Sequence, residues 1–244
     1  MNAQFFVSTH HDNTIMEAEK RTKKGLNWWC DRAWIKFSCA ISAIMTGLIL
    51  WNWESWSTEL KVIAAIGALI PVHVLEEWVF PGGFHYQFNN MYRINQPDRY
   101  PMCRLTDMLT NVLATLFYVF LTVWCVIRGE VSNGIIVGTA LFCALELIIH
   151  TIFGTIMYFR FREKGKTTIY GPGSITAYWG FTVFGVILAY SMKTRTMVGA
   201  DWIEAAGVLG FILLVCILMP DFLFKKKDNQ YFFKSHGYFE RFLK

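Results

Sequence analysis

Long stretches without charged residues constrain the fold of this chain more than any other feature. A helix that crosses the roughly 30 Å hydrocarbon core of a bilayer needs about 20 consecutive apolar residues. Only 17% of the residues are charged, whereas a soluble domain carries about a quarter. Six stretches are apolar and almost free of charge: 37–53, 62–72, 108–127, 134–159, 174–192 and 205–219. The sequence therefore predicts an all-α fold, a polytopic membrane helical bundle of about six transmembrane helices.

The predicted spans define three parts of the chain. Residues 36–223 form the transmembrane domain, 1–35 a segment before it and 224–244 a tail after it. Both flanking segments mix aromatic residues with Lys and Arg, a composition typical of segments in the lipid headgroup layer. The N-terminal segment is too polar for a secretory signal peptide. With their flanks, the spans are expected at 36–53, 60–80, 105–127, 134–158, 173–192 and 202–223.

The distribution of Lys and Arg predicts the orientation of the chain. An even number of spans places both termini on the same side. Of the 23 Lys and Arg residues, four fall on the opposite side: Lys61, Arg128, Lys193 and Arg195. The positive-inside rule then gives an N-in/C-in arrangement with cytoplasmic termini. The net charge of +5 reflects the excess of Lys and Arg on the predicted cytoplasmic side of the membrane. We therefore expect contacts with membrane lipids and no nucleic-acid partner. The sequence leaves the oligomeric state open.

Three ionisable residues occur together inside the second predicted span. His73, Glu76 and Glu77 have i, i+3 and i+4 spacing, so they share one region of a helix surface. Each ionisable residue within a span costs roughly 2.5–3.5 kcal/mol on insertion scales, and such residues are usually functional. Pro81 with the two glycines after it predicts the end of this helix shortly beyond the three residues.

Two further pairs repeat the i, i+4 spacing at a similar predicted depth. Asp107 and Asn111 lie near the start of the third span, and Glu146 and His150 lie in the fourth. On the predicted orientation, all of these groups fall in the cytoplasmic half of the membrane. Asp107 has a structural alternative, because an acid near a helix N-terminus interacts favourably with the helix dipole. A structural role is also the expectation for Asn111.

Four carboxylates at one depth must take up protons, pair with cations or bind metal. Glu and His on facing helices form di-metal sites in helical bundles, and this donor set suits iron, manganese or zinc. We therefore expect one or two divalent ions. The predicted metal ligands are His73, Glu76, Glu77, Asp107, Glu146 and His150. The same set without Asp107 is predicted to be catalytic. The residues expected to bind a substrate are Arg104, Asn111, Trp78 and Tyr170.

The stretch "HVLEEWVFPGGF" resembles the signature of the HXXEE family of integral membrane proteins, found mainly in bacteria. The name motif corresponds to His73, Glu76 and Glu77, and Pro-Gly-Gly-Phe follows at residues 81–84. A later histidine, His150, and a Tyr-x-Pro-Gly element at residues 170–173 extend the resemblance to about 65–190. Gly171 stands where Asn is expected in that element, which removes a polar group. The resemblance implies a membrane fold, a site at the motif and a bacterial cytoplasmic membrane, and it implies no reaction.

A similarity of residue types also links the chain to sterol isomerases of the EXPERA type. Those proteins use His and Glu residues in membrane helices for proton transfer without metal, and His73, Glu77 and Glu146 could act in that way. Three function classes follow. The first is a metal-dependent membrane enzyme acting on a hydrophobic or lipid-like small molecule. The second is a metal-free isomerase or cyclase of an isoprenoid or sterol-like substrate. The third is a transporter or ligand-binding membrane protein.

Overall fold

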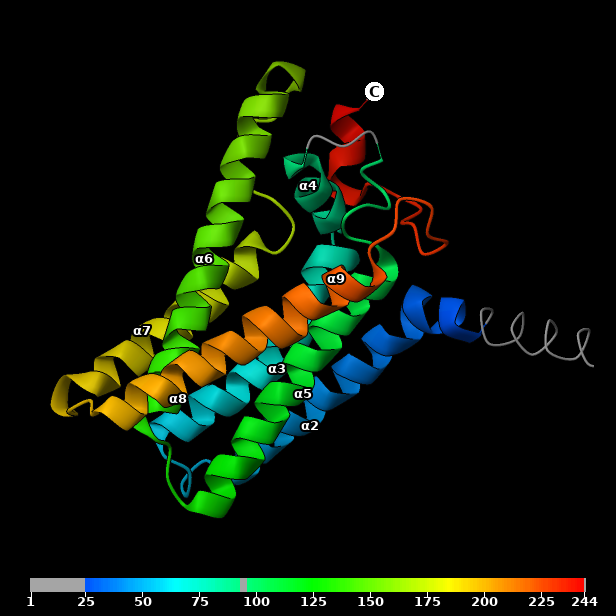
Figure 1. Cartoon of the computed structure of the whole chain (residues 1–244). Helices are drawn as coiled ribbons and strands as arrows, with labels where there is room; N and C mark the ends of the chain where they lie inside the picture. The colour runs from blue at the N-terminus through cyan, green and yellow to red at the C-terminus, as the bar shows by residue number, and fades with distance from the viewer. Residues whose placement is uncertain (1–24, 93–95, 244) are drawn as a thin grey trace, which may run out of the picture.

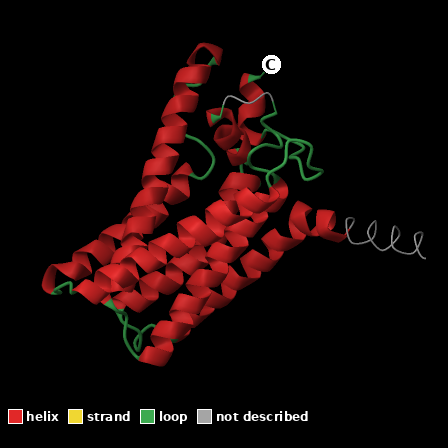
Figure 2. Cartoon of the chain, in the orientation of Figure 1, coloured by secondary structure: helices red, strands yellow, loops and turns green. Residues whose placement is uncertain are grey.

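Helices make up all the regular secondary structure in the part of the chain that the computed structural model describes, residues 25–92 and 96–243 (Figure 2). The predicted all-α fold class is thereby confirmed. Of the predicted N-terminal segment 1–35, residues 1–24 lie outside the described ranges. The remainder includes a short π-helix, η1 (Trp29–Ala33), that leads into the first long helix.

Five helices are long and apolar enough to cross a membrane. Four of them are single or nearly single α-helices, and the last is built from three consecutive helical segments without a break in the chain. Their bounds are α2 (Trp34–Trp51), α3 (Thr58–Trp78), α5 (Arg104–Arg128), α6 (Asn133–Phe161) with a short 3-10 turn, and α8–η5–α9 (Gly199–Gly210, Phe211–Leu218, Met219–Phe224). These helices coincide with five of the six predicted spans.

The segment predicted as the fifth span, 173–192, is helical but shorter than the others. It consists of the six-residue π-helix η3 (Thr176–Phe181) and the ten-residue helix α7 (Thr182–Ser191). A turn directly precedes this helix, and in it the Ser174 amide donates to the Gly171 carbonyl at 3.0 Å. This turn packs against the ionisable residues of the bundle, as described below.

The long helices pack side by side, with α3 between α2 and α5, and with α6 between α7 and α8 (Figure 1). Ile63, Tyr118, Ile136 and Phe181 are almost fully buried where α3, α5, α6 and η3 meet. Small residues allow close contact, because a Cβ at Gly138 of α6 would lie 2.8 Å from Val208 of α8.

Local sequence sets the ends of α3, the helix that carries the motif. The Ser57 hydroxyl accepts a hydrogen bond from the Leu60 amide at 3.2 Å and caps its start. Its end follows from Gly82 and Gly83, whose φ angles of 74° and 101° are costly for other residues. The Gly82 amide donates to the Glu76 carbonyl at 3.1 Å, which satisfies one of the last free carbonyls of the helix.

The tail folds back over the end of α3. We call residues 231–242 the strap; it ends in the 3-10 helix η6 (Gly237–Phe242) and lies beside α4 (Phe84–Met91) in Figure 1. The Tyr238 amide donates to the Gly82 carbonyl at 3.0 Å, and the Arg104 amide donates to the Tyr231 carbonyl at 2.8 Å. The strap therefore covers the turn that closes the motif helix.

Candidate metal centre

The three motif residues lie in the last two turns of α3 and are buried inside the bundle. Their exposed fractions are 5% for His73, 8% for Glu76 and 4% for Glu77. Because the helix is regular here, His73 and Glu77 lie one above the other, while Glu76 points about 100° away from Glu77. This angle separates the two adjacent glutamates into different environments.

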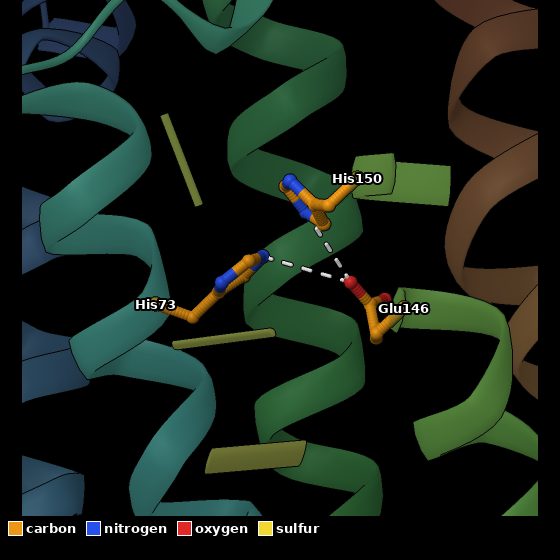
Figure 3. A group of neighbouring side chains, drawn as sticks. All are labelled: His73, Glu146 and His150. Carbon is orange, nitrogen blue, oxygen red and sulfur yellow. Dashed lines mark ion pairs between the residues drawn. The ribbon is translucent and has the colours of Figure 1, made fainter. Parts of the chain in front are cut away.

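Four side chains from α3 and α6 meet at one point, and Figure 3 shows three of them. The Nε2 atom of His73 lies 3.3 Å from Oε1 of Glu77 and 3.6 Å from Oε2 of Glu146. The Nε2 atom of His150 lies 3.5 Å from the same Glu77 oxygen and 3.6 Å from the same Glu146 oxygen. Two imidazole nitrogens thus alternate with two carboxylate oxygens around a common centre. We call His73, Glu77, Glu146 and His150 the quartet.

A hydroxyl at the start of η3 fixes the orientation of His73. Thr176 Oγ1 lies 2.6 Å from His73 Nδ1 and 2.7 Å from Glu76 Oε2. Because the Glu76 carboxylate can only accept, Thr176 donates its proton to Glu76 and accepts from His73 Nδ1–H. A neutral His73 therefore carries its proton on Nδ1 and presents the lone pair of Nε2 to the quartet, which is the arrangement that a metal ligand needs.

Glu76 itself binds the start of η3. Its two oxygens accept hydrogen bonds from the backbone amides of Ile175 at 3.0 Å and Thr176 at 2.9 Å. These amides are among the free donors at a helix N-terminus, where a negative charge is stabilised. Glu76 was predicted as a metal ligand; in the structure its oxygens contact these two amides and the Thr176 hydroxyl, which in turn contacts His73.

The second histidine packs against the same turn. A Cβ placed on Gly173 would lie 2.8 Å from Cε1 of His73 and 2.9 Å from Nδ1 of His150. Gly173 also has a φ of 89°, a conformation that favours glycine. His150 is 1% exposed, and its Nδ1 has no hydrogen-bond partner within the described residues. The turn therefore positions both rings. Thr176 was not among the site residues predicted from the sequence.

The distances within the quartet fit a single metal ion. The donor atoms that His73, Glu146 and His150 can offer all lie within 4.8 Å of one another. The group can hold an ion after only small side-chain movements.

Asp107, the sixth predicted ligand, belongs to a different network. Its Oδ2 accepts from the indole N–H of Trp78 at 2.7 Å, and its Oδ1 accepts from Asn111 Nδ2 at 2.8 Å. Asp107 and Asn111 therefore form the i, i+4 contact that their spacing predicts, but they contact Trp78 and not the quartet. The structure thus brings together four of the six predicted ligands.

Of the predicted substrate-binding residues, Arg104 and Trp78 line one cavity at the end of α3, whereas Asn111 and Tyr170 do not line it. Arg104 forms an ion pair with Asp31, and its Nε donates to the Phe232 carbonyl at 2.7 Å. Tyr170 lies on the loop before α7, where burial and the nearby Glu76 carboxylate raise the pKa of its phenol. Trp78 packs edge to face on Phe233 of the strap, with ring centroids 5.0 Å apart.

Lys166 was not singled out by its sequence and is nevertheless buried, with 2% exposure. Its ammonium group donates to the carbonyl of Tyr170 and faces the ring of Tyr238 at 4.6 Å from the centroid. Burial and the nearby Arg241 lower the pKa of Lys166 to about 8. In the sequence "FREKGKTT" this lysine is indistinguishable from a solvated loop residue.

Comparison with protein families gives one match. The family described as a protein of unknown function with HXXEE motif matches residues 64–188. That range runs from the second turn of α3 to α7 and includes the whole quartet and Thr176. Comparisons with curated proteins and with solved structures gave no match.

Proposed function

This chain belongs to the HXXEE family, and we propose that the motif which defines the family helps to bind one divalent metal ion in a membrane enzyme. The substrate of the proposed enzyme is a hydrophobic or lipid-like small molecule. The proposal rests on the quartet, where both imidazole Nε2 atoms lie 3.3–3.6 Å from the same two carboxylate oxygens.

Charge balance favours a cation at the centre of the quartet. Glu77 is 4% exposed, so its carboxylate cannot rely on water for stabilisation. The Thr176–Glu76 contact directs the lone pair of a neutral His73 toward two carboxylate oxygens, an arrangement that is repulsive unless a positive charge lies between them. One divalent ion would neutralise both carboxylates and accept both nitrogen lone pairs.

The surroundings favour one ion over two. Glu76 is held by the helix N-terminus and Asp107 by Trp78 and Asn111. Neither acid is left to bridge a second metal. Two imidazoles and two carboxylates suit zinc, iron or manganese.

Glu146 is the member of the quartet through which a substrate would gain access. Its side chain is 17% exposed, compared with 5% for Glu77 and 1% for His150. Release of Glu146 from the ion would open a coordination position, as catalytic metal sites require. An ion with an open position polarises a substrate oxygen or activates water. A substrate reaching Glu146 within a membrane-spanning helix has to be soluble in the bilayer, which supports a lipid-like molecule.

A metal-free acid/base centre is the second candidate. The same distances allow each imidazole, when protonated, to contact both carboxylates. Two imidazolium ions would then balance Glu77 and Glu146, and the four groups would move protons on an isoprenoid or sterol-like substrate. The two candidates place the same residues at the centre and differ in whether a metal is bound.

Metal content separates the two candidates. Protein purified in detergent without chelators is compared by elemental analysis with the variants His150→Ala and Glu77→Gln, and with Glu59→Gln as a control acid at the other end of α3. We expect about one metal per chain in the wild type and control, and less than a tenth of that in the two quartet variants. Folded wild-type protein without metal, even after incubation with zinc, iron and manganese salts, would favour the acid/base centre.

Activity needs a separate comparison, because the metal could be structural. Proteoliposomes containing the wild type or His150→Ala are incubated with total bacterial lipid extract, and the extracts are then compared by untargeted mass spectrometry. The proposed enzyme converts at least one hydrophobic species in the wild-type sample only. Identical lipid extracts from the wild-type and His150→Ala proteoliposomes would contradict an enzymatic role on lipids.

A further inference from the structure

A cavity of about 560 Å³ lies where the strap meets the ends of α3 and α5. Its lining includes Trp28, Asp31, Trp78, Arg104, Phe233 and Lys234. This volume is within the range of small-molecule binding sites. None of the quartet residues lines the cavity, so it is a second site, separate from the candidate metal centre.

The cavity lies at the level where the spans end. Trp78 is the last residue of α3, and Arg104 is the first residue of α5. Trp28 is 67% exposed and Phe80, in the turn after α3, is 76% exposed. Exposed aromatic side chains at span ends are typical of the boundary between hydrocarbon and headgroups. A ligand here would therefore meet the headgroup layer.

The charges around the cavity favour an anion. Arg104 is 6% exposed and forms an ion pair with Asp31, while Lys234 Nζ lies 3.5 Å from the other Asp31 oxygen. Of the described residues that line the cavity, Asp31, Arg104 and Lys234 carry charge, which leaves an excess of one positive charge. One phosphodiester would balance that excess. Arg104 is also the residue type best suited to phosphate recognition.

Apolar groups form the remainder of the wall. Val79, Pro81 and Phe233 lie beside the charged groups, and Phe233 stacks on His85 with ring centroids 3.7 Å apart. A free phosphate would leave this apolar surface uncovered, whereas the glycerol backbone and first methylenes of a phospholipid would cover it.

We propose that this cavity binds the headgroup of an anionic phospholipid, with the phosphodiester near Arg104 and Lys234 and the acyl chains directed along the exposed aromatic residues. The bound lipid joins the segment around Trp28, the end of α3 and the strap. This site does not depend on metal binding at the quartet.

Native mass spectrometry of the full-length protein in detergent tests the proposal. The protein is mixed with phosphatidylglycerol, or with diacylglycerol of the same acyl chains, which lacks the phosphate. Lys234 has a 69% exposed side chain, so Lys234→Ala should fold normally. Lys226→Ala removes the same charge from an exposed tail position that does not line the cavity and is the matched control.

We expect the wild type and Lys226→Ala to retain phosphatidylglycerol, and Lys234→Ala to retain at least about fivefold less. Asp31→Asn removes the competing acid and should increase retention. Equal retention of diacylglycerol and phosphatidylglycerol, or equal losses in the two lysine variants, would overturn the proposal. Displacement of the lipid by millimolar inorganic phosphate would show a phosphate site without lipid selectivity and would also overturn it.

Discussion

The Nδ1 atom of His73 lies 2.6 Å from the hydroxyl of Thr176, a residue 103 positions further along the chain. This contact connects the HXXEE motif with the start of η3, because Thr176 also donates to Glu76 of the same motif. The three groups form a carboxylate–hydroxyl–imidazole relay behind the quartet. In metal sites, outer partners of this kind set the tautomer and basicity of a histidine ligand.

Removing the Thr176 hydroxyl should weaken metal binding without removing a ligand. Thr176→Val keeps the shape of the side chain but leaves His73 Nδ1 without its acceptor, so we expect a loss of roughly 10–100-fold in metal affinity. Competition with a chromophoric chelator measures the affinity. Thr176→Ser retains the hydroxyl and should bind as the wild type does. If Val and Ser bind equally well, the relay does not control His73.

The adjacent glutamates should give different phenotypes. Glu77→Gln removes a donor of the quartet and should abolish most metal binding. Glu76→Gln weakens two backbone contacts at the start of η3 and removes a charge from a helix N-terminus, which should cost about 1–2 kcal/mol of stability while metal still binds at saturating concentration. Thermal unfolding and elemental analysis of both variants test this. A metal-free Glu76→Gln protein of normal stability would reverse the two assignments.

Gly173 should tolerate no side chain, for two separable reasons. Its φ of 89° makes any other residue strained by about 1–2 kcal/mol, and a Cβ would also collide with the imidazoles of the quartet. Gly165 has a similar φ of 92° with nothing within 4 Å of its Cβ position, so Gly165→Ala measures the backbone strain alone. We expect Gly173→Ala to lose metal as well as stability. Equal effects of the two substitutions would show that the ring contact is unimportant.

Lys166 should make the stability of the protein depend on pH in the alkaline range. Its folded-state pKa of about 8 is below the usual 10.5, so the unfolded chain binds more protons between these values. The contribution of Lys166 to stability therefore rises as pH increases from about 8 to 10.5 and is least favourable below pH 8. Besides Arg241, the phenol of Tyr238 faces this ammonium group, with Oη 3.3 Å from Nζ.

Thermal unfolding at pH 7, 8, 9 and 10 measures this dependence. The melting temperature of the wild type should rise relative to that of Lys166→Met across that range. Lys164→Met, at an exposed position of the same loop, should show no such trend. A pH-independent difference between the wild type and Lys166→Met would contradict the lowered pKa.

The orientation of the chain can be tested by labelling. On the positive-inside prediction, Ser132 faces outward and Lys164 faces the cytoplasm. A membrane-impermeant maleimide added to intact cells should modify a cysteine at Ser132 and leave one at Lys164 unmodified, in a background from which the six native cysteines have been removed. The opposite labelling pattern would invert the proposed topology.

Spacing within a helix predicted the quartet. The features of the site that were not predicted depend on contacts between segments far apart in the sequence. His73 with Glu77, and Glu146 with His150, are i, i+4 pairs whose proximity follows from helix geometry alone. The role of Glu76 could not be read in the same way, because its partners Ile175 and Thr176 are about 100 residues away.

Two other features of the site depended on the tail. Arg104 and Lys166 are both buried by residues of the strap or its neighbours, including Phe232 and Tyr238. The strap is short, polar in part and without helical periodicity, so its sequence gives no indication of where it docks. The boundaries of the long helices were predictable because the cost of placing charge in a bilayer is independent of such contacts.

The hydrogen bond from Tyr238 to Gly82 also bears on the order in which the protein is assembled. Residues 231–242 are translated after all five long helices. All four quartet residues are therefore synthesised before the strap that covers the turn at the end of α3. The strap can therefore dock on the turn that ends α3 only after every residue of the quartet has been synthesised.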